Sequence, residues 1–163
     1  MKQERSISIQ FAQFDAIEEL PKEEQELLTK AVETSKTAYA PYSKFNVGAA
    51  VRLENGLIVT GSNQENAAYP SGLCAERVAM FAASANQPNK TMTTLAVYAK
   101  GITISEEQIS PCGSCRQVMN EYEVKQNHEI KVLLMNSKGM IWVFQSTLDL
   151  LPFAFTSKAL KKA

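Results

Sequence analysis

The amino-acid sequence predicts an α/β fold with three layers, α/β/α, in which helices cover both faces of a mixed sheet of about five strands. A hairpin signal opens the central part of the chain, and helical and extended patterns alternate after it. Such alternation places helices on both faces of a sheet. A chain of 163 residues suits one hydrophobic core and is short for two. Residues 21–163 are therefore expected to form a single domain, and residues 1–20 an N-terminal extension of unassigned role.

The first third of the chain predicts a strand or arm, a helix and a hairpin. Apolar and polar residues alternate weakly near the N-terminus, and an acidic segment with helical apolar spacing follows Pro21. Asn55 and Gly56 separate two apolar runs and are typical of a tight hairpin turn. The expected ranges are 6–14 for the short strand or ordered arm, 21 to about 38 for the helix, and 45–53 and 57–61 for the strands.

The rest of the chain alternates helices with strands. Breakers at 70–72 precede a run of small and apolar residues that predicts a buried helix, and Pro111 begins a second one. Further apolar runs predict strands, and Pro152 ends a short last helix. The expected ranges are 73–85 and 111 to about 122 for the helices, 93–99, 130–135 and 140–144 for the strands, and a start at 146 or 147 for the last helix.

Charge and composition argue against two kinds of partner. Seventeen basic and seventeen acidic side chains balance to zero net charge, so no broad positive field attracts nucleic acid or anionic lipid. No apolar stretch approaches the ~20 residues that cross a bilayer, and the N-terminus lacks the apolar core of a secretory signal. We expect a cytoplasmic protein with a small neutral ligand. Thiols stay reduced there, so the three cysteines are interpreted as ligands or nucleophiles.

All three cysteines lie at predicted helix starts, where free N–H groups and a partial positive charge favour the thiolate. Cys74 stands in L-C-A-E, and Cys112 and Cys115 stand in P-C-G-S-C. Three thiolates would leave one tetrahedral position of a single Zn²⁺ open for water, which is the mark of a catalytic zinc site. The only histidine, His128, lies in the polar stretch K-Q-N-H-E and is expected to be an ordinary exposed residue.

Charged residues beside the cysteines complete a candidate catalytic site. Glu76, two residues after the first cysteine, is expected to face the bound water without being a ligand and to act as general acid and base. Because three thiolates weaken zinc as a Lewis acid, Arg77 and Arg116 are expected to offset them by donating hydrogen bonds to sulfur. Cys-x-Glu followed by Pro-Cys-x-x-Cys is the known pattern of zinc deaminases.

Five segments of the sequence together resemble one family. They are A-Y-A-P-Y-S-K-F-N-V-G-A-A at 38–50, N-Q-E-N-A-A-Y at 63–69, C-A-E-R at 74–77, P-C-G-S-C-R-Q at 111–117 and L-L-P-F-A-F at 150–155. From about residue 22 to residue 158 the chain resembles the small, homotetrameric, zinc-dependent cytidine deaminases. It departs from that pattern in residues 1–20 and in a slightly long loop at 102–109.

The resemblance implies a role for each of these segments. It implies hydrolysis of cytidine or deoxycytidine to uridine or deoxyuridine and ammonia, as in pyrimidine salvage, with Glu76 carrying a proton to N3 and then to the leaving amino group. Amide and carboxylate groups two residues apart near a strand end share a side and suit paired sugar hydroxyls, although a solvent-facing loop is the alternative. The implied residues are zinc ligands Cys74, Cys112 and Cys115; ribose contacts Phe45, Asn63 and Glu65; the backbone near Ala67 and Ala75, which holds the pyrimidine edge; and Phe155, which stacks on the base across a subunit boundary.

Several alternatives remain open from the sequence. Phe153 is the other candidate for stacking, either phenylalanine suits a core position, and Tyr69 suits a subunit interface or the core equally. The cysteines alone would also fit a thioredoxin-like redox pair or unrelated buried thiols, which would leave Glu76 and Pro111 unexplained. Other functions are a deaminase of another aminopyrimidine such as blasticidin S, a noncatalytic zinc scaffold, and a nucleic-acid editor, which the neutral charge disfavours.

Overall fold

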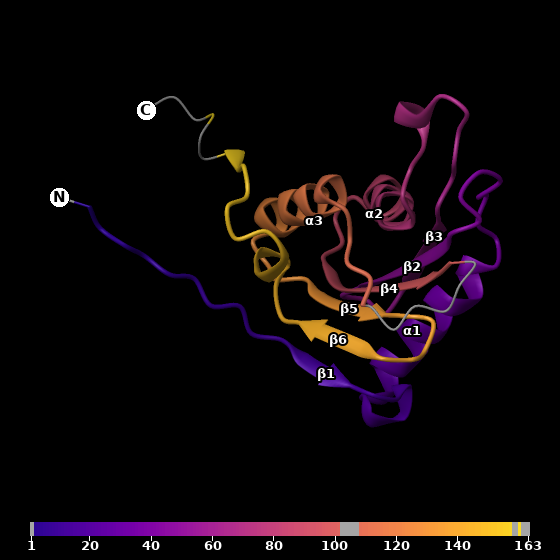
Figure 1. The fold of residues 1–163 in the computed structure, drawn as a ribbon, viewed down its shortest axis with the longest axis horizontal. Helices are drawn as coiled ribbons and strands as arrows, with labels where there is room; N and C mark the ends of the chain where they lie inside the picture. The colour runs from indigo at the N-terminus through magenta and orange to yellow at the C-terminus, as the bar shows by residue number, and fades with distance from the viewer. Residues whose placement is uncertain (1, 102–107, 158–159, 161–163) are drawn as a thin grey trace.

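Six strands form one mixed sheet in the computed structural model, and helices pack on both faces of it (Figure 1). The structure describes residues 2–101, 108–157 and 160, so most of the loop expected at 102–109 lies outside the described residues. The strand order is β1-β6-β5-β4-β2-β3, with β4 and β5 parallel and the other neighbours antiparallel. The strands are β1 (Ala12–Phe14), β2 (Asn46–Leu53), β3 (Ile58–Ser62), β4 (Met92–Lys100), β5 (Lys131–Met135) and β6 (Ile141–Phe144).

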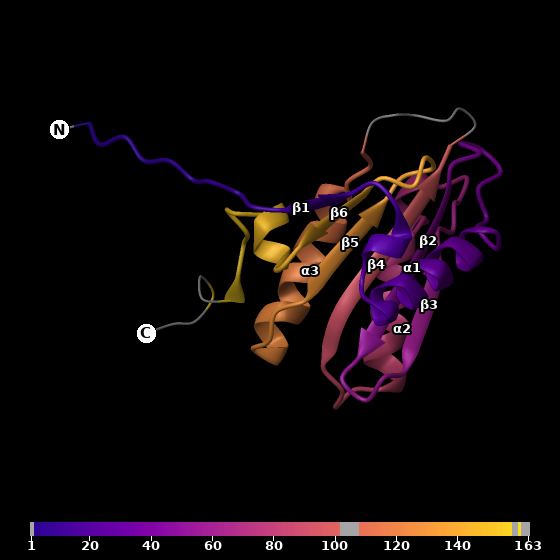
Figure 2. The same cartoon turned by 90° about the horizontal axis from the view of Figure 1, so that it is seen from below.

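Three α-helices make the two outer layers, which confirms the predicted α/β/α arrangement (Figures 1 and 2). Helix α1 (Lys22–Ser35) covers one face and buries its apolar stripe, Leu27, Leu28 and Ala31, against residues of β2, β4, β5 and β6. Helices α2 (Ala75–Asn86) and α3 (Gly113–Gln126) cover the other face. Within the described residues there are also three short 3₁₀ helices: η1 (Ile17–Glu19), η2 (Tyr69–Ser71) and η3 (Thr147–Leu150). In the described part of the chain, no helix is both long and apolar enough to cross a membrane.

The sixth strand comes from the N-terminal residues. Strand β1 pairs antiparallel with β6, and the indole N–H of Trp142 donates to Gln13 Oε1 at 3.0 Å. The Phe11 ring lies 4.7 Å from the Trp142 ring, and Leu20 is buried in the core beneath α1. Residues 2–10 instead run away from the body as an extended, exposed arm (Figures 1 and 2). The segment 6–14, expected to be a strand or an arm, is thus divided between both.

Two helix ends differ from the prediction. Helix α1 stops at Ser35, not near Ala38, because the backbone N–H groups of residues 36–38 turn to carbonyls three residues back, as in a 3₁₀ turn. Helix α3 continues four residues beyond the expected end at Tyr122. It stops at Asn127, which takes the left-handed conformation that closes many helices. The apolar spacing in the sequence fades before Asn127, so this spacing did not indicate where α3 ends.

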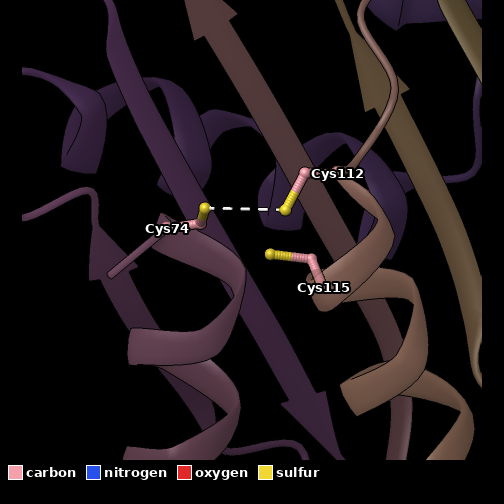
Figure 3. A group of neighbouring side chains, drawn as sticks. All are labelled: Cys74, Cys112 and Cys115. Carbon is pink, nitrogen blue, oxygen red and sulfur yellow. Dashed lines mark hydrogen bonds between the residues drawn. The ribbon is translucent and has the colours of Figure 1, made fainter. Parts of the chain in front are cut away.

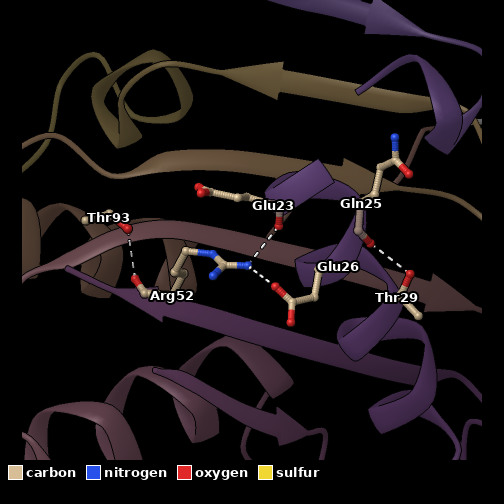
Figure 4. A network of polar contacts seen from close by, with 6 residues as sticks. All are labelled: Glu23, Gln25, Glu26, Thr29, Arg52 and Thr93. Carbon is tan, nitrogen blue, oxygen red and sulfur yellow. Dashed lines mark hydrogen bonds and ion pairs between the residues drawn. The ribbon is translucent and has the colours of Figure 1, made fainter. Parts of the chain in front are cut away.

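Helix α1 is also tied to the sheet by a polar contact at its first two turns. The guanidinium of Arg52, on β2, donates to the backbone carbonyl of Glu23 at 2.9 Å and to Glu26 Oε2 at 2.7 Å (Figure 4). The backbone carbonyl of Arg52 accepts from the Thr93 hydroxyl on the neighbouring strand. Because Glu26 is half exposed, the ion pair itself adds little, and the contact mainly fixes the position of α1.

Helix α1 approaches β2 closely at Gly48, and Gly48→Ala is expected to destabilise the fold by about 3 kcal/mol. A Cβ at this position would overlap the carbonyl oxygen of Ala31 and the backbone of Ser35, which cannot move independently of the helix. Gly113→Ala is the matched control, because a Cβ there meets nothing within 4 Å. Chemical unfolding of both variants measures the effect, and equal stability of the two would contradict the close approach.

Candidate active site

The three cysteines meet where the N-termini of α2 and α3 lie side by side (Figure 3). Cys74 is the N-cap of α2, Cys112 is the N-cap of α3, and Cys115 lies in the first turn of α3. Neither N-cap side chain makes a capping hydrogen bond to the backbone of its own helix, and all three sulfurs point toward one another. The predicted position of the cysteines at helix starts is confirmed.

The sulfur geometry suits one zinc ion. The three Sγ atoms lie within 4.8 Å of one another, and those of Cys74 and Cys112 are 3.9 Å apart. Zinc–sulfur bonds of ~2.3 Å at tetrahedral angles place two sulfurs about 3.8 Å apart. Three protein ligands leave the fourth position open, as in catalytic sites. The donor set therefore fits a resident Zn²⁺ held by Cys74, Cys112 and Cys115.

Hydrogen bonds within the cluster favour the ionised form of one thiol. A bond from the Cys115 thiol is the largest cause that lowers the pKa of Cys74 to about 5, and Arg77 lowers it further. The Arg77 guanidinium donates to Cys74 Sγ at 3.8 Å, as predicted from its place one turn along α2. The same thiol pair and burial raise the pKa of Cys115. Arg77 is therefore placed to offset the charge that ligand sulfur carries.

The hydrogen-bond partners of Arg116 differ from the predicted cysteine sulfurs. Its Nε donates to the carbonyl oxygen of Pro111 at 2.7 Å, and its Nη1 donates to the carbonyl oxygen of Leu150 at 2.9 Å. Carbonyl oxygens, not sulfur, are therefore the acceptors for both of these donors. The side chain leaves α3 on the side of η3, so sequence adjacency to Cys115 did not bring it to the cysteine sulfur.

Glu76 lies in the first turn of α2 and is 5% exposed. Burial is the largest cause that raises the pKa of its carboxyl group, and the negative charge of Cys74 raises it further. A carboxyl group with a raised pKa exchanges protons more readily near neutral pH than an ordinary glutamate. Glu76 also lines the cavity that adjoins the cysteines. Its position suits a proton carrier beside the metal.

A cavity of about 730 Å³ opens above this cluster, a size typical of small-molecule sites. Apolar lining residues come from β2, β4, β5 and the segment before α3. Polar lining residues come from the segment before β2, the segment between β3 and α2, and the first turn of α2. The lining residues that the argument uses are Phe45, Asn63, Glu65, Tyr69, Cys74, Glu76 and Cys112.

Asn63 and Glu65 line the cavity but already make bonds to the protein. Asn63 Oδ1 accepts from the Val47 N–H at 2.8 Å, and its amide donates to the Phe45 carbonyl at 2.9 Å. Glu65 accepts from the backbone N–H of Tyr42 at 2.9 Å and from the hydroxyl of Ser43. The Ser43 bond is the largest cause that lowers the pKa of Glu65. Both side chains therefore also hold the segment that carries Phe45.

The other expected substrate contacts lie at the mouth of the cavity or outside its lining. Tyr69 lines its mouth and is 80% exposed. Ala67 is exposed, Ala75 is buried at the start of α2, and neither is among the described residues that line the cavity. Phe155 is 61% exposed and lies outside that lining, and Phe153 is 86% exposed, so neither is a core residue of the domain. His128 is exposed, as predicted.

Sequence reasoning missed the individual roles of Tyr42 and Ser43. Both line the cavity, and both bond to Glu65. They stand inside the segment 38–50 that carries the family resemblance. The segment was therefore noticed, but no role was assigned to either residue. The apolar lining residues, which include Val97 and Met135, were also missed because buried strand residues look alike in a sequence.

The fold and the site together define a class. A thiolate-lined zinc site at two helix N-termini, with a buried glutamate facing a small-molecule cavity, is the arrangement of zinc-dependent deaminases, which are hydrolases.

Comparison with known proteins places the chain within that class. A family model described as the cytidine and deoxycytidylate deaminase zinc-binding region matches residues 21–128. The cytidine deaminase of Sporosarcina psychrophila is 40% identical over 139 residues, which cover 85% of this chain and 96% of the relative. That of Halalkalibacterium halodurans is 38% identical over 134 residues, with 82% and 95% covered. The solved cytidine deaminase from Burkholderia pseudomallei has a TM-score of 0.71 and 40% identity, with 80% and 97% covered. The chain belongs to the cytidine and deoxycytidylate deaminase family.

Proposed function

We propose that this chain is a cytidine deaminase that hydrolyses cytidine and deoxycytidine to uridine and deoxyuridine with release of ammonia. The observation that carries the proposal is the convergence of three cysteine sulfurs within 4.8 Å of one another and a buried glutamate at one cavity large enough for a nucleoside. The relatives that match over most of their length are named cytidine deaminases. A nucleoside is thus the substrate that the cavity and the family both support.

Glu76 carries the protons of the reaction. Zinc at the three cysteines supplies Lewis acidity and lowers the pKa of water. The Glu76 carboxylate takes a proton from the attacking water and gives it to N3 of the pyrimidine while oxygen bonds to C4. It then takes the remaining proton from the new C4 hydroxyl and gives it to the amino group, so that the C4–N4 bond breaks, a C4 carbonyl forms and ammonia leaves. Burial of Glu76 excludes bulk water as a competing proton source.

The proposed ribose contacts are Phe45, Asn63 and Glu65. Glu65→Gln is expected to raise the KM for cytidine by about 10-fold or more, since the ionised acceptor for Ser43 and for a sugar hydroxyl is lost. Steady-state kinetics with cytidine measures the change. Glu54→Gln is the control, because Glu54 lies in the β2–β3 turn and pairs with Lys90.

A substrate analogue separates the two roles of Glu65. If the carboxylate bonds a sugar hydroxyl, the KM penalty of Glu65→Gln should shrink for 2′,3′-dideoxycytidine, which lacks both hydroxyls. An equal penalty for both substrates would mean that Glu65 only holds the segment at Tyr42 and Ser43, and the ribose contact would be rejected.

An ultraviolet assay tests the function itself. Purified protein with one zinc per chain is expected to convert cytidine to uridine, with blasticidin S as the competing substrate. Turnover of blasticidin S without turnover of cytidine would move the chain to the other aminopyrimidine deaminases. No turnover of either by zinc-loaded protein would favour the noncatalytic scaffold, and salt-dependent binding to single strands would indicate a nucleic-acid editor.

A homotetramer is the proposed assembly, with the backbone near Ala67 and Ala75 holding the pyrimidine edge and Phe155 reaching the base of a neighbouring subunit. Two features support it: Phe155 and Phe153 are exposed outside their own cavity, and Tyr69 is exposed at the cavity mouth. Light scattering during size-exclusion chromatography measures the number of subunits, and a monomer that turns over cytidine normally would reject the shared site.

A further inference from the structure

Side chains of α3 fasten the segment 146–155 that follows the last strand. Glu123, 7% exposed, accepts from the Ser146 hydroxyl at 2.6 Å and from the Thr147 N–H at 2.9 Å. Gln117 donates to the Phe155 carbonyl at 2.7 Å. Arg116 donates to the Leu150 carbonyl at 2.9 Å. Helix α3 thus fixes both the beginning and the end of η3.

Arg116 is the one member of this set that also reaches the metal site. Its Nε bonds the carbonyl of Pro111, the residue that precedes Cys112. Among the described hydrogen bonds, this is the one that holds the Pro111 carbonyl, while the Cys112 carbonyl accepts from the α3 backbone. The planar guanidinium holds two acceptors in fixed relation, which the single ammonium of lysine cannot do.

We propose that Arg116 is a positioning residue that makes η3 part of the zinc site. It clamps the Pro111–Cys112 turn to the end of η3 and so fixes the direction of the Cys112 sulfur. Leu150 is 6% exposed in the core, so η3 offers a firm support. Cys112 itself is exposed and has little packing to hold it. The clamp therefore acts on zinc retention, whichever aminopyrimidine is the substrate.

Zinc release to a chromophoric chelator tests the clamp in the zinc-loaded protein. Arg116→Lys and Arg116→Gln are both expected to release zinc at least about 10-fold faster than the natural chain, the usual effect of losing a group that orients a ligand. Visible spectra of the cobalt-substituted forms should shift in both variants, because the sulfur–metal geometry changes. Gln117→Ala is the matched control: it breaks a bond to the same segment one residue away without touching Pro111.

A double-mutant cycle tests the part played by η3. Glu123→Gln weakens the hydrogen bonds that hold the start of η3, so it is also expected to speed zinc release. In the double variant with Arg116→Gln, the increase in release rate should be smaller than the product of the two single increases, because both residues act through η3. Natural zinc retention in Arg116→Lys would overturn the clamp in favour of a simple charge effect. Equal loss in Gln117→Ala, or independent effects in the cycle, would also overturn it.

Discussion

Glu76→Gln is expected to lower turnover of cytidine by about 10²–10⁴-fold while one zinc per chain stays bound. Glutamine has the same size but can neither accept nor donate the acidic proton, and the 5% exposure of this site gives water little access to replace it. Since Glu76 is no zinc ligand, metal content should not change. Steady-state kinetics and metal analysis on the same preparation measure both quantities.

A carboxylate on the protein surface provides the control for that substitution. Glu121→Gln alters an exposed residue of α3 and should leave turnover as it is. Glu76→Asp should retain part of the activity, because the carboxyl group remains but lies one methylene farther back. A turnover of Glu76→Gln within a few-fold of the natural chain would remove Glu76 from the mechanism.

Cys115→Ser is expected to abolish zinc binding and, with it, turnover. The Cys115 sulfur is fully buried and lies between the two helix N-termini, so no outside ligand can take its place. A serine hydroxyl ionises far less readily than a thiol and is a poor ligand for zinc. Added zinc should raise the unfolding temperature of the natural chain but not that of the variant, because only a folded state that binds zinc is stabilised.

The neighbouring serine separates metal loss from a local packing effect. Ser114 is exposed in the same turn of α3, so Ser114→Ala should keep one zinc and full activity. If Cys115→Ser retained stoichiometric zinc, the three-sulfur site would be wrong. Plasma emission spectrometry of the purified proteins reads the metal content directly.

The metal site could be predicted from sequence because its chemistry depends on local spacing. Cys112 and Cys115 are three residues apart, so one helix turn brings their sulfurs together, and Glu76 follows Cys74 in the first turn of α2. The hairpin turn at Asn55 and Gly56 was equally local, and Gly56 has the positive φ that such turns need.

The features that sequence reasoning missed depend on contacts between distant segments. Arg116 stands next to a ligand in sequence, yet the carbonyl of Leu150, 34 residues away, determines where its side chain points. A strand or an arm was expected at 6–14, but the pairing of β1 with β6 was not, because three residues alone carry too little pattern to reveal a partner. Asn63 and Glu65 were assigned to the ligand side only, and their bonds to the segment at 42–47 emerged from the folded arrangement.

The arm at residues 2–10 has a practical consequence. Nine extended residues span roughly 30 Å, and the figures show them leaving the body beyond β1. A fluorescent reporter or an affinity handle joined ahead of residue 2 would therefore sit at the end of a natural spacer. Attachment to a sensor chip ahead of residue 2 leaves the pairing of β1 with β6 intact, so it need not disturb the domain.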